Sequence, residues 1–130
     1  MLTVELGATL SSCQIARKRI AAYARELPGN VDLLAVKLCV SEAVATAIHY
    51  RGSSGRGRVR LDAGVNGDDN LKVTVQADAD EESPASRSAN GFAHALMVRL
   101  ADRVRLHESP DTGLRIELRF GVESGDLVDP

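Results

Sequence analysis

The feature that most constrains the fold is the segment 31–50, where apolar side chains cover nearly the whole circumference of one helix. A helix that is apolar all round is a buried helix. Its length and flanks favour a core helix, because no stretch reaches the roughly 18 uncharged apolar residues of a membrane span. A chain of 130 residues, 44% of them hydrophobic and 26% charged, has the composition of one globular domain. We therefore expect a single domain built around this helix.

Helical and alternating patterns on both sides of this segment predict the other elements. Ser11 or Ser12 can cap a helix, which the Pro-Gly pair at 28–29 ends. Residues 66–70 are rich in turn formers and join two strands into a hairpin. A third helix is predicted to start near Gly91. Strands are predicted at 2–6, 58–65, 71–78, 104–108 and 113–120.

The order of these elements predicts the fold class. Strands joined by hairpins are antiparallel, and three helices can cover only one face of such a sheet. We predict an α+β fold, a two-layer sandwich whose mixed, mainly antiparallel sheet is covered on one face by three helices. Residues 1–120 are expected to form this single domain, and residues 121–130 a loose, acidic C-terminal tail.

Charge and cysteine content exclude several classes of function. The formal net charge is −2, and aromatic residues make up only 3%, with no Trp. Nucleic-acid-binding domains usually have a basic excess and stacking rings, so direct binding of nucleic acid is not expected. Cys13 and Cys39 lie in apolar stretches without a CxxC motif, which indicates two buried thiols in a reducing compartment. With no signal sequence or membrane span in the pattern, we expect a cytoplasmic protein.

The first candidate site lies on the apolar helix. Glu42, Thr46 and His49 follow one another at i, i+4 and i+7, on one narrow face. A carboxylate in a buried helix is costly unless it is paired or faces a cavity, so this face is a candidate cavity wall. The alternative is that the stripe faces solvent or that Glu42 pairs with Arg51 or Arg99.

Three segments together resemble a known family. The run from Leu38 to Ile48 is similar to the first ATP-site motif of the anti-sigma-factor serine kinases, which has Ser-Glu-Ala-Val-Thr-Asn-Ala there. Residues 90–104 resemble the family's Gly-x-Gly-Leu helix with Leu-Ala-Asp after it, and residues 112–118 resemble its closing Gly-Thr strand. The resemblance spans roughly residues 3–120. It implies the histidine-kinase-like (GHKL, Bergerat) ATPase fold shared with gyrase and Hsp90.

The resemblance assigns roles on the helix and on the hairpin, but with departures. Glu42 matches the family's general base, while Thr46 occupies the position of the Asn that holds Mg²⁺. A Thr hydroxyl can ligate Mg²⁺ in phosphate sites, but it offers one oxygen on a shorter arm. The family's adenine-recognising Asp-x-Gly falls on Ala77 and Ala79. Asp78 is one step off, and it could serve only if a bulge re-aimed it.

The glycine motifs are also incomplete. Gly91 matches, but the second glycine is Ala93 and the following Leu is His94. Gly113 is kept, whereas the family's Thr is Leu114. The family's Asn, Asp, Gly and Thr are thus missing at four recognition positions. Each lost polar ligand costs about 1–3 kcal/mol of binding free energy. We therefore expect no useful ATP affinity. ATP and Mg²⁺ are expected as cofactors only if the site is functional.

Other motifs give weaker signals. The glycine-rich segment 52–57 lacks the Gly-Lys-Ser/Thr ending of a P-loop and follows a helix instead of a strand. The acidic residues at 78 and 80–82 lack the spacing of metal ligands and are expected to form a solvated loop. His94 and His107 have no Cys or His partner nearby, so core or surface roles are expected for both.

Three functions remain open. The first is a regulator of the anti-sigma-factor type, which would control transcription by binding a sigma factor or an anti-anti-sigma partner, with a degenerate ATP site. The second is an active Mg-ATP-dependent serine protein kinase that uses Thr46 and a re-aimed Asp78. The third is an α+β domain that binds a small ligand under the loop 78–90.

Charge on the first helix suggests where partners dock. Arg17, Lys18, Arg19 and Arg25 give this helix a basic face. The predicted strand at 2–6 is a short edge strand that can pair with a second copy. We therefore expect a homodimer, or a complex with a sigma-factor or anti-anti-sigma-like protein, through this strand and helix.

Overall fold

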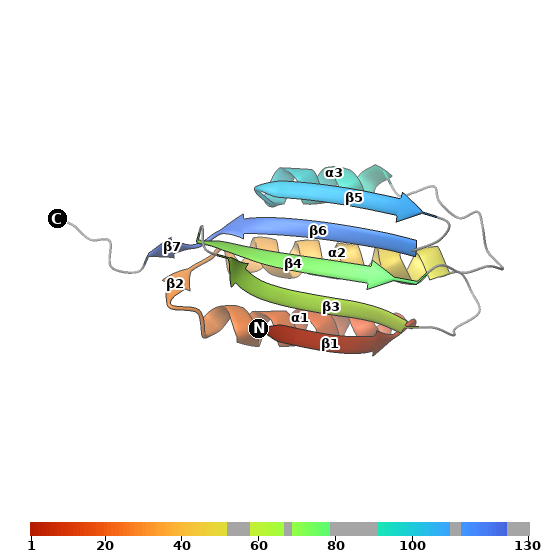
Figure 1. Ribbon diagram of the computed structural model, residues 1–130, viewed down its shortest axis with the longest axis horizontal. Helices are drawn as coiled ribbons and strands as arrows, with labels where there is room; N and C mark the ends of the chain where they lie inside the picture. Colours follow the sequence, from red (N-terminus) through yellow and green to blue (C-terminus); the bar gives the residue numbers. More distant parts are fainter. Residues whose placement is uncertain (52–57, 67–68, 79–90, 110–112, 125–130) are drawn as a thin grey trace.

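A five-stranded sheet forms one layer of the molecule, and three helices form the other (Figure 1). The computed structural model describes residues 1–51, 58–66, 69–78, 91–109 and 113–124. Along the chain the elements are β1 (Leu2–Gly7), α1 (Ser11–Arg25), β2 (Gly29–Asn30), α2 (Leu33–Arg51), β3 (Arg58–Asn66), β4 (Asn70–Ala77), α3 (Gly91–Leu100), β5 (Arg103–Ser109), β6 (Gly113–Gly121) and β7 (Glu123–Ser124).

The large sheet has the strand order β1-β3-β4-β6-β5. All four neighbouring pairs are antiparallel, so the described strands of this sheet contain no parallel pair. The three helices lie behind the same face of the sheet in Figure 1. The predicted α+β sandwich is confirmed.

Helix α2 is the centre of the helical layer. It contacts α1 and α3 on its two sides and β3, β4 and β6 beneath it. By length and composition alone, Leu33–Tyr50 could cross a membrane. In this fold the same helix packs as a core helix, and its inward residues are buried. The prediction of a buried central helix is therefore confirmed.

Alternation along the strands separates the core from the open face of the sheet. Every second residue of the central strands is apolar and turns toward the helices. These side chains are fully or almost fully buried: Val59, Leu61, Ala63, Leu71, Val73, Val75, Ala77, Leu114, Ile116, Leu118 and Phe120. The register Leu61↔Val75↔Ile116 stacks three of them across the sheet.

Helix starts differ from the prediction in their chemistry. Neither Ser11 nor Ser12 caps α1: Leu10 is the N-cap residue, and it makes no side-chain capping hydrogen bond. The Ser12 hydroxyl instead donates to the carbonyl oxygen of Gly7 at 2.7 Å, tying α1 to the end of β1. At the start of α2, a carboxylate oxygen of Asp32 accepts from the backbone N–H of Ala35 at 3.1 Å, as an N-cap side chain does.

A second, two-stranded sheet pairs β2 with β7, which the sequence patterns did not predict. A Cβ at Gly29 would collide with the backbone of Glu123, so this close pairing requires glycine there. Residues 121–124, the start of the predicted tail, thus belong to β6, β7 and the link between them. Residues 125–130 lie outside the described residues, and the division into domain and tail stays a prediction.

Candidate functional site

The candidate ligand residues gather at one end of the sandwich. Figure 1 shows the end of β4, the start of α3 and the start of β6 at the same end of the sheet, close to the last turns of α2. Ala77 of β4 is paired with Leu114 of β6, and α2 contacts both α3 and β4. The fold therefore brings the neighbourhoods of Thr46, Asp78 and Gly91 together, as the resemblance implies.

The polar stripe of α2 lies on the outer side of the helix. Glu42 and Thr46 are half-buried, and His49 is exposed. The described residues place no hydrogen-bond or ion-pair partner at the Glu42 carboxylate, and Arg99 is exposed on α3. The side chain of Arg51 lies outside the description. A solvent-facing stripe describes these residues better than a closed cavity wall.

Thr46 uses its hydroxyl within its own helix. Its Oγ1 donates to the backbone carbonyl oxygen of Glu42, one turn earlier, at 2.8 Å. This is the local back-bond that Ser and Thr make in helices. This bond uses the hydroxyl proton, and the Oγ1 atom sits on a shorter arm than the amide oxygen of the Asn that the resemblance places here. Thr46 therefore offers a single oxygen with less reach than that Asn.

The end of β4 has no carboxylate on its helix-facing side. Ala77 is 1% exposed and is packed in the core between Val59 and Leu114, its partners on β3 and β6. The register is unbroken from Asn70 to Ala77, so no bulge interrupts the paired length of β4. Asp78, one step further on, is exposed. Ala79 and the acidic residues 80–82 lie outside the described residues, as does the loop proposed to cover a ligand.

The two matched glycines have different surroundings. Gly91 opens α3, where backbone N–H groups are free of intrahelical partners. His94, in the first turns, is exposed, and so is His107 on β5, which confirms a surface position for both. Gly113 opens β6 with a φ of 92°, a conformation that strongly favours glycine. The backbone conformation of Gly113 itself therefore explains this glycine without any bound nucleotide.

The interface between α1 and α2 contains both thiols. Cys39 is buried as predicted, while Cys13 is only half-buried. Burial raises the pKa of the Cys39 thiol to about 11, and the negative charge of Glu42 adds to this rise. Burial also raises the pKa of Cys13, with Arg17 opposing and Glu42 assisting. Both cysteines are therefore poor nucleophiles near neutral pH.

Arg17 is not a simple surface charge. Its Nη1 donates to the Ser41 hydroxyl at 2.8 Å, so this side chain bridges α1 and α2. The other three basic residues of the predicted face, Lys18, Arg19 and Arg25, are exposed. The contact joins residues 24 positions apart, and no sequence pattern signals it.

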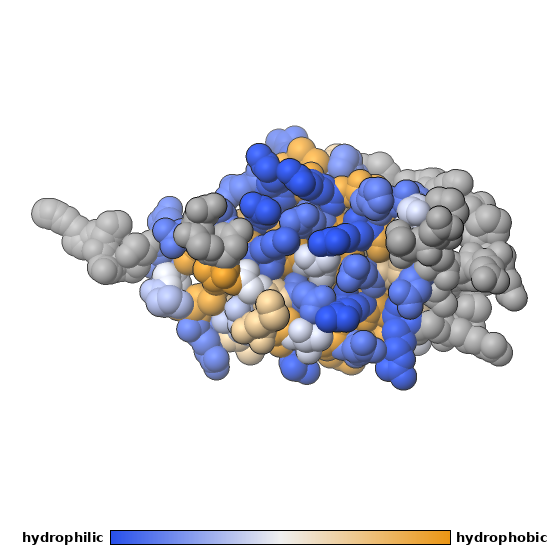
Figure 2. All heavy atoms as spheres, viewed as in Figure 1, coloured by the Kyte–Doolittle hydropathy of each residue, from blue (hydrophilic) through white to orange (hydrophobic). Residues whose placement is uncertain are grey.

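The open face of the sheet carries a network of charges that the sequence analysis did not single out. The Glu117 carboxylate lies 3.2 Å from Lys72 Nζ and 3.5 Å from Arg119 Nη2. Burial alone would raise the pKa of Glu117. The hydrogen bond from Lys72, with the charges of Lys72, Arg119 and Arg115, outweighs burial and holds this pKa below its ordinary value. Figure 2 shows hydrophilic side chains over these strands.

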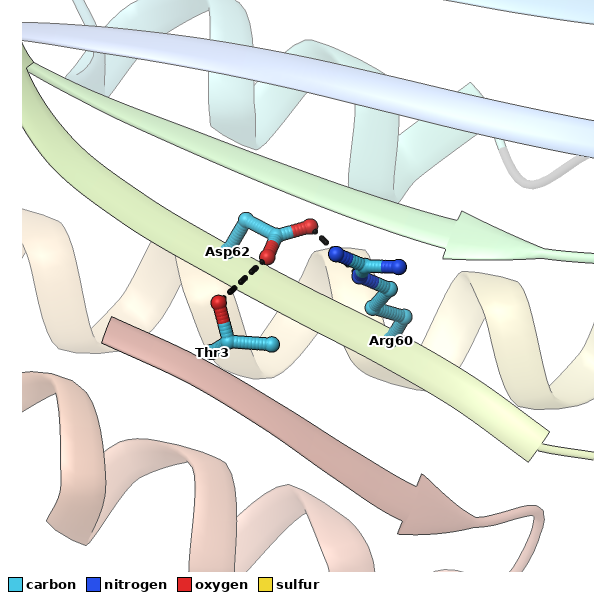
Figure 3. Close-up of polar contacts among 3 residues, drawn as sticks. All are labelled: Thr3, Arg60 and Asp62. Atoms are coloured by element: carbon cyan, nitrogen blue, oxygen red, sulfur yellow. Dashed lines mark hydrogen bonds and ion pairs between the residues drawn. The ribbon is translucent and has the colours of Figure 1, made fainter. Parts of the chain in front are cut away.

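A second polar cluster joins β1 to β3 on the same face. The Thr3 hydroxyl donates to Asp62 Oδ1 at 2.8 Å, and Arg60 Nε donates to Asp62 Oδ2 at 3.0 Å (Figure 3). The signal that could have found both clusters was the alternation itself, because polar residues at every second position of paired strands must share one face.

Comparison with known proteins identifies the class of protein that this fold defines. The family model described as "Histidine kinase-like ATPase domain" matches residues 6–120. The chain belongs to this family, which confirms the superfamily that the motifs resemble. No curated protein matches the chain.

A solved structure shows the same fold. It is described as the crystal structure of the RsbU and RsbW domains of Rv1364c from Mycobacterium tuberculosis. The similarity covers 94% of the present chain, with 16% identity and a TM-score of 0.73. The chain spans about a third of that protein, since the similarity covers 33% of it. At this identity the likeness establishes the fold.

Proposed function

We propose that this protein is a regulator of the anti-sigma-factor kinase type that acts by binding proteins, and that its nucleotide site no longer binds ATP usefully. The observation that carries the proposal is the position of Ala77. Where the family has the carboxylate that recognises adenine, this chain has a methyl group with 1% exposure, held between two core strands. A buried methyl offers adenine no hydrogen bond, and the space is filled.

Two further positions support the loss of nucleotide binding. The Thr46 hydroxyl is bonded to the Glu42 carbonyl oxygen, in place of an Asn amide that could reach a metal. Asp78 is exposed, one residue past the position from which a side chain would face the helices. Neither residue is the ligand type that the family uses at its position for Mg²⁺ or for adenine.

Calorimetry with Mg-ATP and Mg-ADP tests this proposal. The wild-type protein is expected to release no binding heat at micromolar nucleotide. The triple variant Thr46→Asn, Ala77→Asp, Ala79→Gly restores the family's ligands and should recover measurable affinity in the molecules that remain folded, although Ala77→Asp by itself destabilises the core. Thermal melts of this variant with and without nucleotide control for folding, because a ligand that binds the folded state raises its stability. Micromolar binding by the wild type would overturn the proposal.

An active serine kinase is the second candidate, and one observation favours it. Glu42 occupies the family's general-base position, is half-exposed, and has no hydrogen-bond or ion-pair partner among the described residues. A general base must be accessible to the hydroxyl group from which it takes a proton. Transfer of phosphate from ATP to a serine-containing protein by the wild type, lost in Glu42→Gln, would establish the kinase. We expect neither protein to transfer phosphate.

The partners that we propose are a sigma factor or an anti-anti-sigma-like protein, bound in the cytoplasm. A second copy of the chain, forming a homodimer, is the other partner that we propose. The exposed charges of Lys18, Arg19 and Arg25 lie on α1, and β1 is an edge strand of the sheet. Sedimentation at several concentrations, with and without Lys18→Glu plus Arg19→Glu, tests the dimer. Arg17 is left intact because its bond to Ser41 has a structural role. A monomer throughout, with no partner recovered from native cytoplasm, would contradict this part of the proposal.

A further inference from the structure

Strand β5 is the uncovered edge of the sheet. In the described part of the chain it pairs only with β6, and every residue except Val104 and Ser109 is exposed. The opposite edge is better covered, because Val4 and Leu6 of β1 are buried. An edge strand presents a row of unpaired backbone N–H and C=O groups, which can pair with another chain.

The outward side of β5 carries unneutralised positive charge. Arg103, Arg105 and His107 alternate along the strand on the open face, opposite Arg119, Glu117 and Arg115 of β6. The acid of this group, Glu117, is already bonded to Lys72 and Arg119. Neither Arg103 nor Arg105 has an ion-pair partner among the described residues. Arg105, His107 and Arg115 line a shallow hollow there.

The inward side of the same edge has Val104 and Leu106 followed by an exposed acid, Glu108, and its apolar part is incompletely covered. Leu106 belongs to the helix-facing set of β5, opposite Ile116, yet it is 45% exposed. Val98 of α3 is 53% exposed, and α3 contacts β5. One more strand beside β5 would have its helix-facing side chains near this apolar surface, while its alternate side chains would lie beside Arg103 and Arg105.

We propose that the β5 edge binds an extended acidic segment of a partner protein as an additional strand of the sheet. The segment that fits alternates carboxylate side chains, which face Arg103, Arg105 and His107, with apolar side chains, which cover Leu106. This inference deepens the proposed function and rests on it in one respect, that the chain acts by binding proteins. It names the chemistry of the segment that is bound.

Two other occupants fit less well. A second copy pairing through β5 would set one row of arginines against another, and like charges directly opposite are destabilising. A nucleic acid would meet the Glu117 carboxylate in the middle of the patch, and the described open face of β5 and β6 carries no Phe, Tyr or Trp for base stacking. A peptide strand added to β5 lies on the side of β5 away from β6, which carries Glu117.

The test uses two peptides of identical composition. One alternates Glu and Val over eight residues, and the other has four Glu followed by four Val. Each is titrated into the ¹⁵N-labelled full chain at pH 7. The alternating peptide is expected to bind about fivefold more tightly than the block peptide and to slow amide exchange along residues 103–109. Raising the salt from about 0.01 M to about 0.15 M should weaken binding, since exposed charges are screened.

Charge-reversal variants locate the contact. Arg103→Glu with Arg105→Glu should weaken binding of the alternating peptide about tenfold or more. Lys37→Glu with Arg58→Glu changes the net charge equally, on α2 and β3, and should weaken it less than twofold. Lys37 is half-buried, Arg58 has 71% of its side chain accessible, and neither lies on β5 or on the basic face of α1.

Several results would overturn the inference. They are an equal loss of peptide affinity in the two double variants, equal affinity for the two peptides, and protection from amide exchange at β1 instead of β5. Tighter binding of a thymidine oligonucleotide than of the peptide is a further such result. A concentration-dependent dimer that Arg103→Glu with Arg105→Glu abolishes would assign the edge to self-association and would also overturn it. Calorimetry with Mg-ATP is independent of these measurements, so failure of the peptide site and failure of the proposed loss of nucleotide binding are distinguishable.

Discussion

The two faces of the sheet are built from alternate residues of the same strands, yet they have opposite chemistry. On the covered face, Leu61, Val75 and Ile116 pair across three strands with no exposure. On the open face, Lys72 and Glu117 meet as an ion pair at 3.2 Å. A side chain on the first face is surrounded by packed hydrocarbon, and one on the second face exchanges partners with water.

This difference explains where function can reside. The position that the resemblance assigns to adenine recognition falls on the covered face, where Ala77 is part of the core. The unneutralised arginines of β5 lie on the open face, where a charged partner can reach them. The contrast between the faces leads to four predictions, in order of decreasing effect on the free energy of unfolding.

The largest effect is expected from a charge on the covered face. Ala77→Asp should lower the free energy of unfolding by about 4 kcal/mol at pH 7, because a carboxylate would be buried without a partner. Gln76→Asp, the neighbouring residue on the open face, is the matched control and should change it by less than about 1 kcal/mol. Urea denaturation measures both variants. Similar losses in the two would show that the faces are not as different as their burial indicates.

A cavity on the covered face should have the next largest effect. Leu118→Ala removes a fully buried side chain and should cost about 3 kcal/mol. Arg119→Ala, one residue on, removes a half-buried side chain of the open face and should cost about 1 kcal/mol or less. The two urea midpoints are compared at unchanged slope. A loss below about 1 kcal/mol for Leu118→Ala would contradict close packing under α2.

The Glu117 network should contribute less, and its contribution should depend on pH. Glu117→Gln is expected to cost about 1 kcal/mol at pH 7. Folding lowers the pKa of Glu117 below its ordinary value of 4.5, so its charge stabilises the folded state above that pH. As the pH falls through the lowered pKa, both states bind the proton and this contribution is lost.

Stability curves between about pH 3 and pH 7 test this linkage. The difference in free energy of unfolding between the wild type and Glu117→Gln should be constant above about pH 5 and should shrink at lower pH. Glu123→Gln, an exposed acid outside the network, is the control and should show no such trend. A difference that grew toward low pH would reverse the sign and refute the network.

The smallest effect is expected at the edge of the open face. A double-mutant cycle of Thr3→Val and Asp62→Ala should give a coupling energy of about 0.5 kcal/mol, because the hydrogen bond is exposed to water. The same cycle with Glu5→Gln in place of Thr3→Val is the control, since no contact joins Glu5 to Asp62. Coupling above about 2 kcal/mol would show that this edge is as rigid as the core.

Local patterns predicted the elements well and their capping contacts poorly. The all-round apolarity of residues 31–50 predicted α2, and period-two alternation predicted both hairpins. Asp32 was missed as the cap of α2, although its position three residues before Ala35 was a usable signal. Val104 fits both the end of a helix and the start of a strand by pattern, and it lies in β5.

The elements that carry the candidate residues were predictable, but the orientation of their side chains was not. The motifs placed Glu42, Thr46, Gly91 and Gly113 on their elements before any fold was known. That the Thr46 hydroxyl bonds to its own helix depends on a side-chain rotamer, which spacing does not determine. Contacts such as Arg17 with Ser41 depend on how two helices pack, so no motif contains them.

The sequence by itself determined which residues share a face, because alternation along a strand and the turn of a helix follow from backbone geometry alone. It determined the buried α2, the two hairpins and the absence of a carboxylate at residue 77. Only the tertiary structure decided that Ala77 is sealed between β3 and β6, that Glu117 is shared by Lys72 and Arg119, and that β5 is left as a basic, uncovered edge. The physical reason is that strand order and helix packing bring together side chains far apart in the chain, and local periodicity contains no information about distance between elements.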